Sequence, residues 1–212
     1  MIFEDLKIKD DYFKLTNSLL NRLKKDLLLS NSKLVIGICG ESGSGKSITA
    51  MCLQRALKKQ NRSSIILHQD SYYKLSPKEN NKKRKADLNW VGPHEVNMVL
   101  LQEHLNAFKS NQEMINAPVV DYKKNSFQNK EISLIEHSIL IVEGVYTFFL
   151  DNLDSKIFLE RTYKETIDNR KSRTREVYHP FVESVLDIEH NIIKQLNYFA
   201  DIRIDNTYRV IL

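Results

Sequence analysis

The residues that most directly suggest chemistry are Gly40-Glu41-Ser42-Gly43-Ser44-Gly45-Lys46-Ser47, which match the pattern G-x-x-x-x-G-K-[ST]. Glycines allow such a loop to turn its backbone N–H groups inward, and a helix beginning near Lys46 adds its positive dipole end. Lys46 can reach the outer phosphates of a nucleotide, and the Ser47 hydroxyl can be one ligand of Mg²⁺. A glycine-rich turn without a ligand is the alternative. The residues expected to hold a nucleotide are Gly40, Glu41, Ser42, Gly43, Ser44, Gly45, Lys46, Ser47 and Ile48.

Two carboxylates lie at the ends of apolar runs that are typical of buried strands. Asp70 follows residues 64–69, and Glu143 lies in the run 139–144. Ligands of parallel α/β sheets bind at the carboxyl ends of the strands, so both side chains are expected beside the phosphates. Asp70 is the candidate base that takes the proton of an attacking hydroxyl, with a helix or turn cap as the alternative. A buried carboxylate is costly unless it meets a cation, so Glu143 is expected to serve Mg²⁺, directly or through water.

A basic segment follows the short apolar run 157–159 and contains Arg161, Lys164, Arg170, Lys171, Arg173 and Arg175. One interpretation is a lid that closes arginines over the transferring phosphoryl group. A solvated basic helix face is the alternative.

These side chains need a scaffold that brings distant segments together. The apolar run 34–39 predicts a strand before the glycine-rich loop, and Ile48, Cys52 and Ala56 predict a helix after it. Further strands are predicted at 64–69, 139–144, 157–159 and 201–205, and further helices at 96–109 and 182–199. The pattern indicates a doubly wound α/β domain with a mainly parallel sheet of about five strands and helices on both faces.

Two segments interrupt this strand and helix pattern. Alternating residues within about 115–134 predict a small β-hairpin at the sheet edge, which can wall off a second substrate. The polar stretch 76–86 has no period and predicts an exposed loop. Its cluster Lys82-Lys83-Arg84-Lys85 could contact nucleic acid in isolation, but a solvated loop is the preferred interpretation.

The N-terminal residues predict a separate element. Leu15, Leu19, Leu23 and Leu27 recur at intervals of four, so an amphipathic helix is expected over 11–29. Packing on the outside of the sheet is the simpler role, and a contact that forms a homo-oligomer is the alternative. Residues 1–32 are therefore expected to be an extension of a main domain that spans 33–212.

Composition narrows the class of protein. A chain of 212 residues suits one α/β domain, and its formal charge of +5 is explained as well by a polyanionic nucleotide as by nucleic acid. Cys39 and Cys52 occupy apolar positions and are expected to be reduced core residues. No apolar run approaches membrane-spanning length and the N-terminus is charged, so a cytoplasmic protein without a membrane or nucleic-acid partner is expected.

Taken together, the motifs resemble the phosphoribulokinase/uridine kinase family of P-loop kinases over roughly residues 33–205. The resemblance rests on the loop Gly40–Ser47, on Asp70-Ser71-Tyr72-Tyr73, on Val142-Glu143-Gly144 and on Ala200-Asp201-Ile202. It implies a P-loop kinase domain that uses ATP and Mg²⁺, with Asp70 as the base and a lid at about 163–181. The lid arginines of the family correspond to Arg170 and Arg173, which together with Lys46 and Asp70 are the expected catalytic residues. Two other arginines usual in the lid are replaced by Thr166 and Asn169.

The chain departs from the family in the acceptor region. Residues 89–94 and 118–127 occupy the segments in which uridine kinases carry carboxylates that hold the ribose, and a tyrosine, a histidine and an arginine that hold the base. At the corresponding positions this chain has other residues. The side chains expected to face the acceptor are Tyr73, Lys74, His94, Tyr122 and Asn125. A pocket that loses hydrogen-bonding partners discriminates poorly for the substrate those groups served.

The resulting hypothesis is an ATP-dependent kinase that phosphorylates a hydroxyl of a small metabolite, with a nucleoside as acceptor in the manner of uridine kinase. The same chemistry on pantothenate, a sugar phosphate, glycerate or another nucleoside is the first alternative, and Lys123, Lys124 and His94 would suit an anionic acceptor. A nucleotide-binding ATPase or regulatory protein without metabolite kinase activity is the second.

Overall fold

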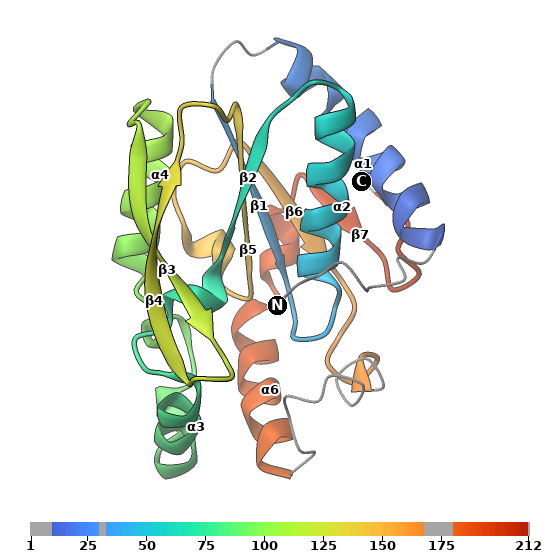
Figure 1. Ribbon diagram of the computed structural model, residues 1–212. Coiled ribbons are helices and arrows are strands. Elements are labelled where there is room, and N and C mark those ends of the chain that lie inside the picture. The colour runs from blue at the N-terminus through green and yellow to red at the C-terminus, as the bar shows by residue number, and fades with distance from the viewer. Residues whose placement is uncertain (1–9, 30–32, 168–179, 212) are drawn as a thin grey trace.

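A five-stranded parallel sheet forms the centre of the computed structural model, which describes residues 10–29, 33–167 and 180–211 (Figure 1). The strands are β1 (Leu34–Gly40), β2 (Ser64–His68), β5 (Ile139–Gly144), β6 (Ser155–Leu159) and β7 (Ile202–Ile204), in the order β2-β5-β1-β6-β7. All of these pairings are parallel. Every residue of β1 and β5 is buried, because both faces of these central strands are covered. The predicted doubly wound, mainly parallel α/β fold is confirmed.

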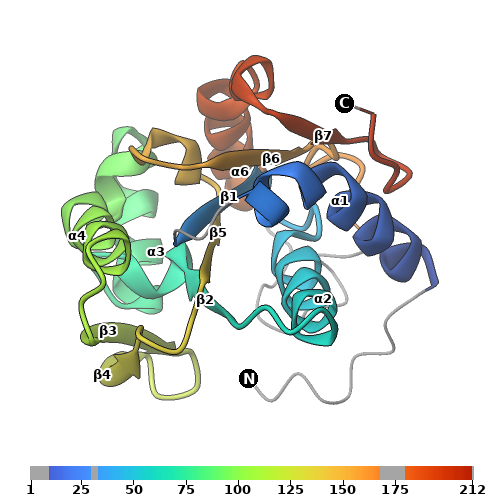
Figure 2. The same ribbon diagram turned by 90° about the horizontal axis from the view of Figure 1, so that it is seen from above.

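Helices cover both faces of the sheet. They are α1 (Asp10–Leu29), α2 (Lys46–Lys59), α4 (Met98–Lys109) and α6 (Pro180–Ile193). Figure 2 shows α1 and α2 on one side of the sheet and α4 on the other. Alternate residues of β1 divide between two cores: Ile36 and Ile38 pack with α1 and α2, whereas Val35 packs with α4 and Ile193 of α6. The strand after which the phosphate loop begins is therefore held from both sides.

The N-terminal helix lies beside α2 on the same face of the sheet (Figure 2). Its residues Leu15, Leu19 and Leu23 are buried in the core that α2 shares with the strands. None of the described helices is long and apolar enough to cross a membrane. Cys39 and Cys52 are free and buried, as expected for core residues.

A hairpin lies beside the sheet and the helix α4 (Figure 1). It consists of β3 (Met114–Asp121) and β4 (Ser126–Ser133), which pair antiparallel in a sheet of their own. In the turn, Asp121 Oδ1 accepts hydrogen bonds from the backbone N–H groups of Lys123 and Lys124, and Asn125 takes a positive φ of 54°. The predicted hairpin is confirmed.

The expectation of a loop at 76–86 was wrong, although most of these residues are exposed as expected. Residues Pro77–Ala86 form a helix, α3. Proline suits the first position of a helix, because the backbone N–H that it lacks would have no partner within the helix. The Ser76 hydroxyl donates to Glu79 Oε2 at 2.6 Å, and Asn80 and Arg84 bond to groups outside the helix. The stretch is polar because its anchoring contacts are hydrogen bonds, so hydrophobic periodicity could not reveal it.

Short 3₁₀ helices connect the remaining elements. They are Gln69–Tyr72, Leu88–Trp90, Pro93–Glu95, Thr147–Phe149 and Leu196–Phe199. The helix expected at 182–199 runs instead as α6 to Ile193 and is followed by the last of these turns. Most of the expected lid, including Arg170, Arg173 and Asn169, lies outside the described residues.

Candidate active site

The phosphate loop joins the end of β1 to the start of α2. Gly43 and Gly45 have left-handed φ angles of 81° and 105°, which side-chain-bearing residues rarely adopt. A Cβ on Gly45 would also lie 2.7 Å from Tyr12 Oη and 3.1 Å from the ring of Tyr208. The sequence therefore needs glycine here for both conformation and space, which is what a loop with inward N–H groups requires.

Two side chains of the loop provide donors for an anion. Lys46 Nζ donates to the carbonyl of Glu41 at 2.8 Å, and its side chain is buried beside the loop. Ser44 Oγ is buried and has no hydrogen-bond partner within the described part of the chain. A phosphate oxygen would satisfy this hydroxyl, so the residues of the loop fit a polyphosphate.

The expected metal-facing residues are in direct contact. Ser47 Oγ donates to Glu143 Oε1 at 2.9 Å, and His68 Nδ1 lies 2.7 Å from the same oxygen. His68 and Glu143 are register partners on β2 and β5, so the contact follows from the pairing of the strands. Burial alone would raise the pKa of Glu143, but the hydrogen bond and charge of His68, with Lys46 and Ser47, outweigh it and lower the pKa. Glu143 is therefore held as an anion.

The pKa of His68 shifts in the opposite direction. Burial alone would lower it, but the hydrogen bond and charge of Glu143 raise it above its ordinary value. No group of three or more His, Cys, Asp or Glu residues that could hold a metal exists among the described residues. One carboxylate and one hydroxyl fit Mg²⁺, which keeps several waters and takes phosphate oxygens as its other ligands. Sequence reasoning missed His68, although it lies on the strand that ends at Asp70.

Asp70 lies in the 3₁₀ helix that follows β2 and is exposed to solvent. The phenol of Tyr122, in the hairpin turn, donates to Asp70 Oδ2 at 3.1 Å. The neighbouring Ser71 Oγ accepts a hydrogen bond from Val120 N at 3.2 Å. Two contacts thus hold the hairpin against the end of β2, and they bring Tyr122 to the candidate base.

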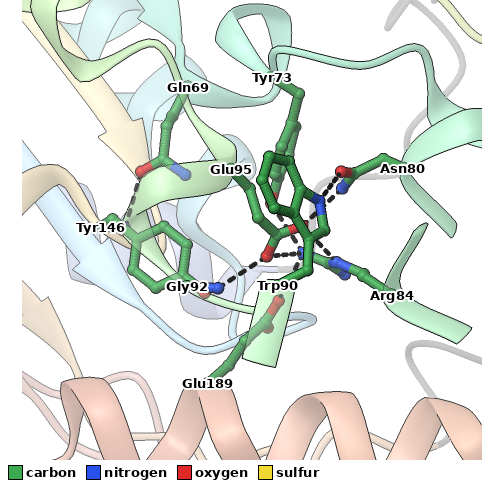
Figure 3. Close-up of polar contacts among 9 residues, drawn as sticks. All are labelled: Gln69, Tyr73, Asn80, Arg84, Trp90, Gly92, Glu95, Tyr146 and Glu189. Carbon is green, nitrogen blue, oxygen red and sulfur yellow. Dashed lines mark hydrogen bonds and ion pairs between the residues drawn. The ribbon is translucent and has the colours of Figure 1, made fainter. Parts of the chain in front are cut away.

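Gln69, the residue before Asp70, is fixed by the end of β5. Its Oε1 accepts a hydrogen bond from Tyr146 N at 2.7 Å, as Figure 3 shows. A Cβ on Gly144 would lie 2.4 Å from Gln69 Cβ, so this close approach of the two strand ends requires glycine. Asp70 is therefore placed by the neighbouring strand as well as by its own.

A buried polar cluster forms beside this edge of the sheet (Figure 3). Glu95 is fully buried and accepts from Arg84 Nε and Nη2 at 2.5 and 2.9 Å, from Asn80 Nδ2 at 2.6 Å and from Gly92 N at 2.8 Å. Trp90 Nε1 donates to Asn80 Oδ1 at 2.8 Å. Glu95 thus uses its carboxylate to fold the segment between α3 and α4. Sequence reasoning missed this pairing of Glu95 with Arg84, because polar contacts between different elements leave no periodic pattern.

Glu189 of α6 completes this cluster. Its Oε1 lies 3.2 Å from Arg84 Nη2, which is also 3.4 Å from the phenol of Tyr73. Burial raises the pKa of Glu189 to about 7, against the opposing charge of Arg84 and with help from Glu95 and Asp70. A carboxyl group that titrates near neutrality therefore lies close enough to the candidate base to interact with it.

The other expected acceptor residues are less directly placed. His94 is exposed and meets Trp90 edge to face at 5.3 Å, and the side chain of Lys74 is exposed. Asn125 uses both ends of its amide within the protein, since Nδ2 donates to Ser76 Oγ and Oδ1 accepts from Lys78 N. Asn125 therefore joins the hairpin to α3.

Comparison with known proteins gives consistent matches. The sequence model of the phosphoribulokinase/uridine kinase family matches residues 35–194. A uridine kinase of Ureaplasma parvum is 30% identical over 193 residues, covering 76% of this chain and 92% of that protein. A uridine kinase of Leuconostoc citreum is 31% identical over 182 residues, covering 80% of this chain and 85% of that protein.

Solved structures show the same fold. A protein of Bacillus stearothermophilus described as a "possible uridine kinase" matches with a TM-score of 0.62 at 19% identity, over 87% of this chain and 98% of that chain. Phosphoribulokinase from Rhodobacter spheroides matches with a TM-score of 0.58 at 13% identity, over 83% of this chain and 71% of that chain. At these identities the structures support the fold and leave the acceptor open.

Proposed function

The chain belongs to the phosphoribulokinase/uridine kinase family and is an ATP-dependent phosphotransferase, and from this premise we propose that its acceptor is a hydroxyl of an uncharged nucleoside, with uridine first. The observation that carries the proposal is the convergence of two contacts at one edge of the sheet. Ser47 contacts Glu143 beside the phosphate loop. Tyr122 contacts Asp70 at the end of β2, which β5 separates from β1.

The roles of the residues follow from this arrangement. Lys46 and the loop amides bind the phosphates of ATP, and Ser47 and Glu143 would hold Mg²⁺, which neutralises charge on the phosphate oxygens. Asp70 orients the acceptor hydroxyl and accepts its proton as the oxygen bonds to the γ-phosphorus and ADP leaves. Arg170 and Arg173 are proposed to stabilise the transferring group, as the family resemblance implies.

The acceptor side supports an uncharged substrate. Arg84 is a partly buried cation of this region, and Glu95 and Glu189 already pair with it. The exposed carboxylate of Asp70 adds negative charge, which disfavours an anionic acceptor such as glycerate or a sugar phosphate. Hydroxyl groups, in contrast, can donate to carboxylates, as the ribose of a nucleoside does.

The test is an acceptor panel with Mg-ATP, in which ADP release is measured and the product is identified by mass spectrometry. The panel contains uridine, cytidine, adenosine, pantothenate, glycerate and a sugar phosphate. Turnover that depends on a nucleoside and yields its monophosphate would support the proposal. Turnover only with the anionic acceptors would contradict the nucleoside proposal and indicate an anionic substrate. Acceptor-independent hydrolysis stimulated by nucleic acid would indicate an ATPase instead.

A further inference from the structure

A carboxylate lies inside the phosphate loop itself. Glu41 is the first residue after β1, and only 6% of its surface is exposed. Its Oε1 lies 2.7 Å from His190 Nδ1, and its Oε2 accepts a hydrogen bond from the backbone N–H of Tyr163. Because a carboxylate can only accept, His190 donates through Nδ1.

This carboxylate poses an electrostatic problem for a loop that binds polyphosphate. An anion beside the phosphates opposes binding, and burial strengthens the effect because little water screens it. Lys46 does not neutralise it directly, since its ammonium group donates to the backbone carbonyl of Glu41 rather than to the carboxylate. Among the described residues, His190 and Tyr163 N donate to the two carboxylate oxygens. They fix its direction and reduce its field at the loop.

His190 is well placed for this task because α6 is anchored on both sides of it. The preceding residue, Glu189, pairs with Arg84 at 3.2 Å. One turn earlier, Asp187 Oδ1 accepts a hydrogen bond from the phenol of Tyr163 at 3.3 Å, and the Tyr163 ring meets the His190 ring edge to face at 6.0 Å. Adjacent residues of one helix therefore contact the acceptor-side cluster and the phosphate loop.

The loop is held a second time at its next residue. Thr166 is buried, and its hydroxyl donates to the carbonyl of Ser42 at 3.0 Å. Residues 163–166 and α6 thus contact the two positions after Gly40. The backbone groups that would bind phosphate follow directly from these positions, so their placement depends on these contacts.

We propose that His190 is a positioning residue for the nucleotide: by holding the Glu41 carboxylate it lets the phosphate loop accept a polyphosphate. The inference rests on the nucleotide-binding part of the proposed function and is independent of which acceptor is used. It predicts that loss of the imidazole weakens nucleotide binding only while Glu41 carries its charge.

The experiment compares His190→Ala, Glu41→Gln and the double variant by calorimetric binding of Mg-ATP and of inorganic tripolyphosphate, without an acceptor. His190→Ala should weaken the binding of both ligands about tenfold or more, since the buried Glu41 carboxylate loses its side-chain donor. In the Glu41→Gln background, the same replacement of His190 should change both affinities by less than about threefold, because no carboxylate charge is then left without a partner. His137→Ala is the matched control, because this histidine bonds to the exposed Ser63 hydroxyl away from the loop.

Thermal unfolding of the same proteins distinguishes this role from a contribution to the stability of the fold alone. Lower melting temperatures with unchanged affinities would overturn the proposal, as would a double variant that binds no better than His190→Ala. Loss of ATP affinity with normal tripolyphosphate affinity would also overturn it, because the effect would then act on the nucleoside part. A protein that shows the expected pattern but phosphorylates no acceptor would refute the proposed function and leave this inference standing.

Discussion

The phenol of Tyr122 lies 3.1 Å from Asp70 Oδ2, although the two residues are 52 positions apart in the chain. Asp70 follows the edge strand β2, whereas Tyr122 belongs to the hairpin turn. The hairpin therefore does more than wall off a second substrate, since it supplies a hydrogen-bond donor to the candidate base. Its docking through Ser71 and Val120 fixes the distance at which this donor acts.

Replacing Asp70 by Asn should lower kcat by about 10²-fold or more, because the amide cannot accept the proton of the acceptor hydroxyl. Mg-ATP affinity should remain within about twofold of wild type, since none of the phosphate-loop contacts among the described residues involves Asp70. Steady-state kinetics and equilibrium binding of ATP measure the two quantities. Normal turnover by Asp70→Asn would remove the residue from its assigned role.

Replacing Tyr122 by Phe should lower kcat/KM for the acceptor about tenfold, because one hydrogen bond to a charged carboxylate is lost while the ring remains. The KM for ATP should not change. Tyr198→Phe is the matched control, since Tyr198 is 81% exposed and lies outside the site. Equal effects of the two substitutions on acceptor kinetics would contradict a specific role of Tyr122.

Replacing Glu143 by Gln should raise the Mg²⁺ concentration needed for half-maximal rate by about tenfold or more, because Mg²⁺ prefers anionic oxygen ligands. The measurement is a Mg²⁺ titration of turnover at fixed ATP. Glu136→Gln is the control, since Glu136 is exposed on the loop before β5. An unchanged Mg²⁺ dependence in Glu143→Gln would mean that the carboxylate serves only His68 and Ser47.

Glu189 should make the stability of the protein depend on pH. Its folded-state pKa of about 7 lies above the ordinary value of 4.5, so the folded protein binds the proton more tightly. The contribution is fully present below about pH 4.5 and is lost as pH rises through about 7. In wild type the free energy of unfolding should therefore fall by up to about 3 kcal/mol across this pH range. Glu189→Gln should abolish this fall.

Urea unfolding at about pH 5 and about pH 8 measures this difference. Glu113→Gln, at an exposed position, should keep the slope of wild type. The same slope in Glu189→Gln would show that another group causes the pH dependence.

Two glycines of the central strands should differ in their tolerance of alanine. In Gly144→Ala the new Cβ would lie 2.4 Å from Gln69 Cβ, so the segment that carries Asp70 must shift. In Gly37→Ala it would lie 2.7 Å from Leu153 Cδ1, the end of a side chain that can rotate away. Gly144→Ala is expected to destabilise the protein by about 1–3 kcal/mol and to reduce kcat, and Gly37→Ala by less. Denaturant unfolding and kinetics of both variants test this, and equal losses would contradict it.

Patterns in the chain predicted the sheet because its strands are apolar and each ends at a recognisable polar residue or glycine. The same reasoning was wrong at Pro77–Ala86, since α3 is held by Asn80 and Arg84 rather than by an apolar face. It also passed over His68, which looks like an ordinary strand residue until the register places it opposite Glu143. Polar contacts between distant segments leave no periodic signal.

The sequence alone determined the phosphate loop, the parallel α/β fold and the family, because these depend on local residue types and on short-range spacing. Only the tertiary structure decided that Tyr122 reaches Asp70, that Glu95 and Glu189 share Arg84, and that His190 holds Glu41. Each of these contacts joins two different elements of the chain, and hydrogen bonds act over only about 3 Å. Their partners are therefore fixed by packing, which brings the ends of the strands and the start of α2 to one edge of the sheet.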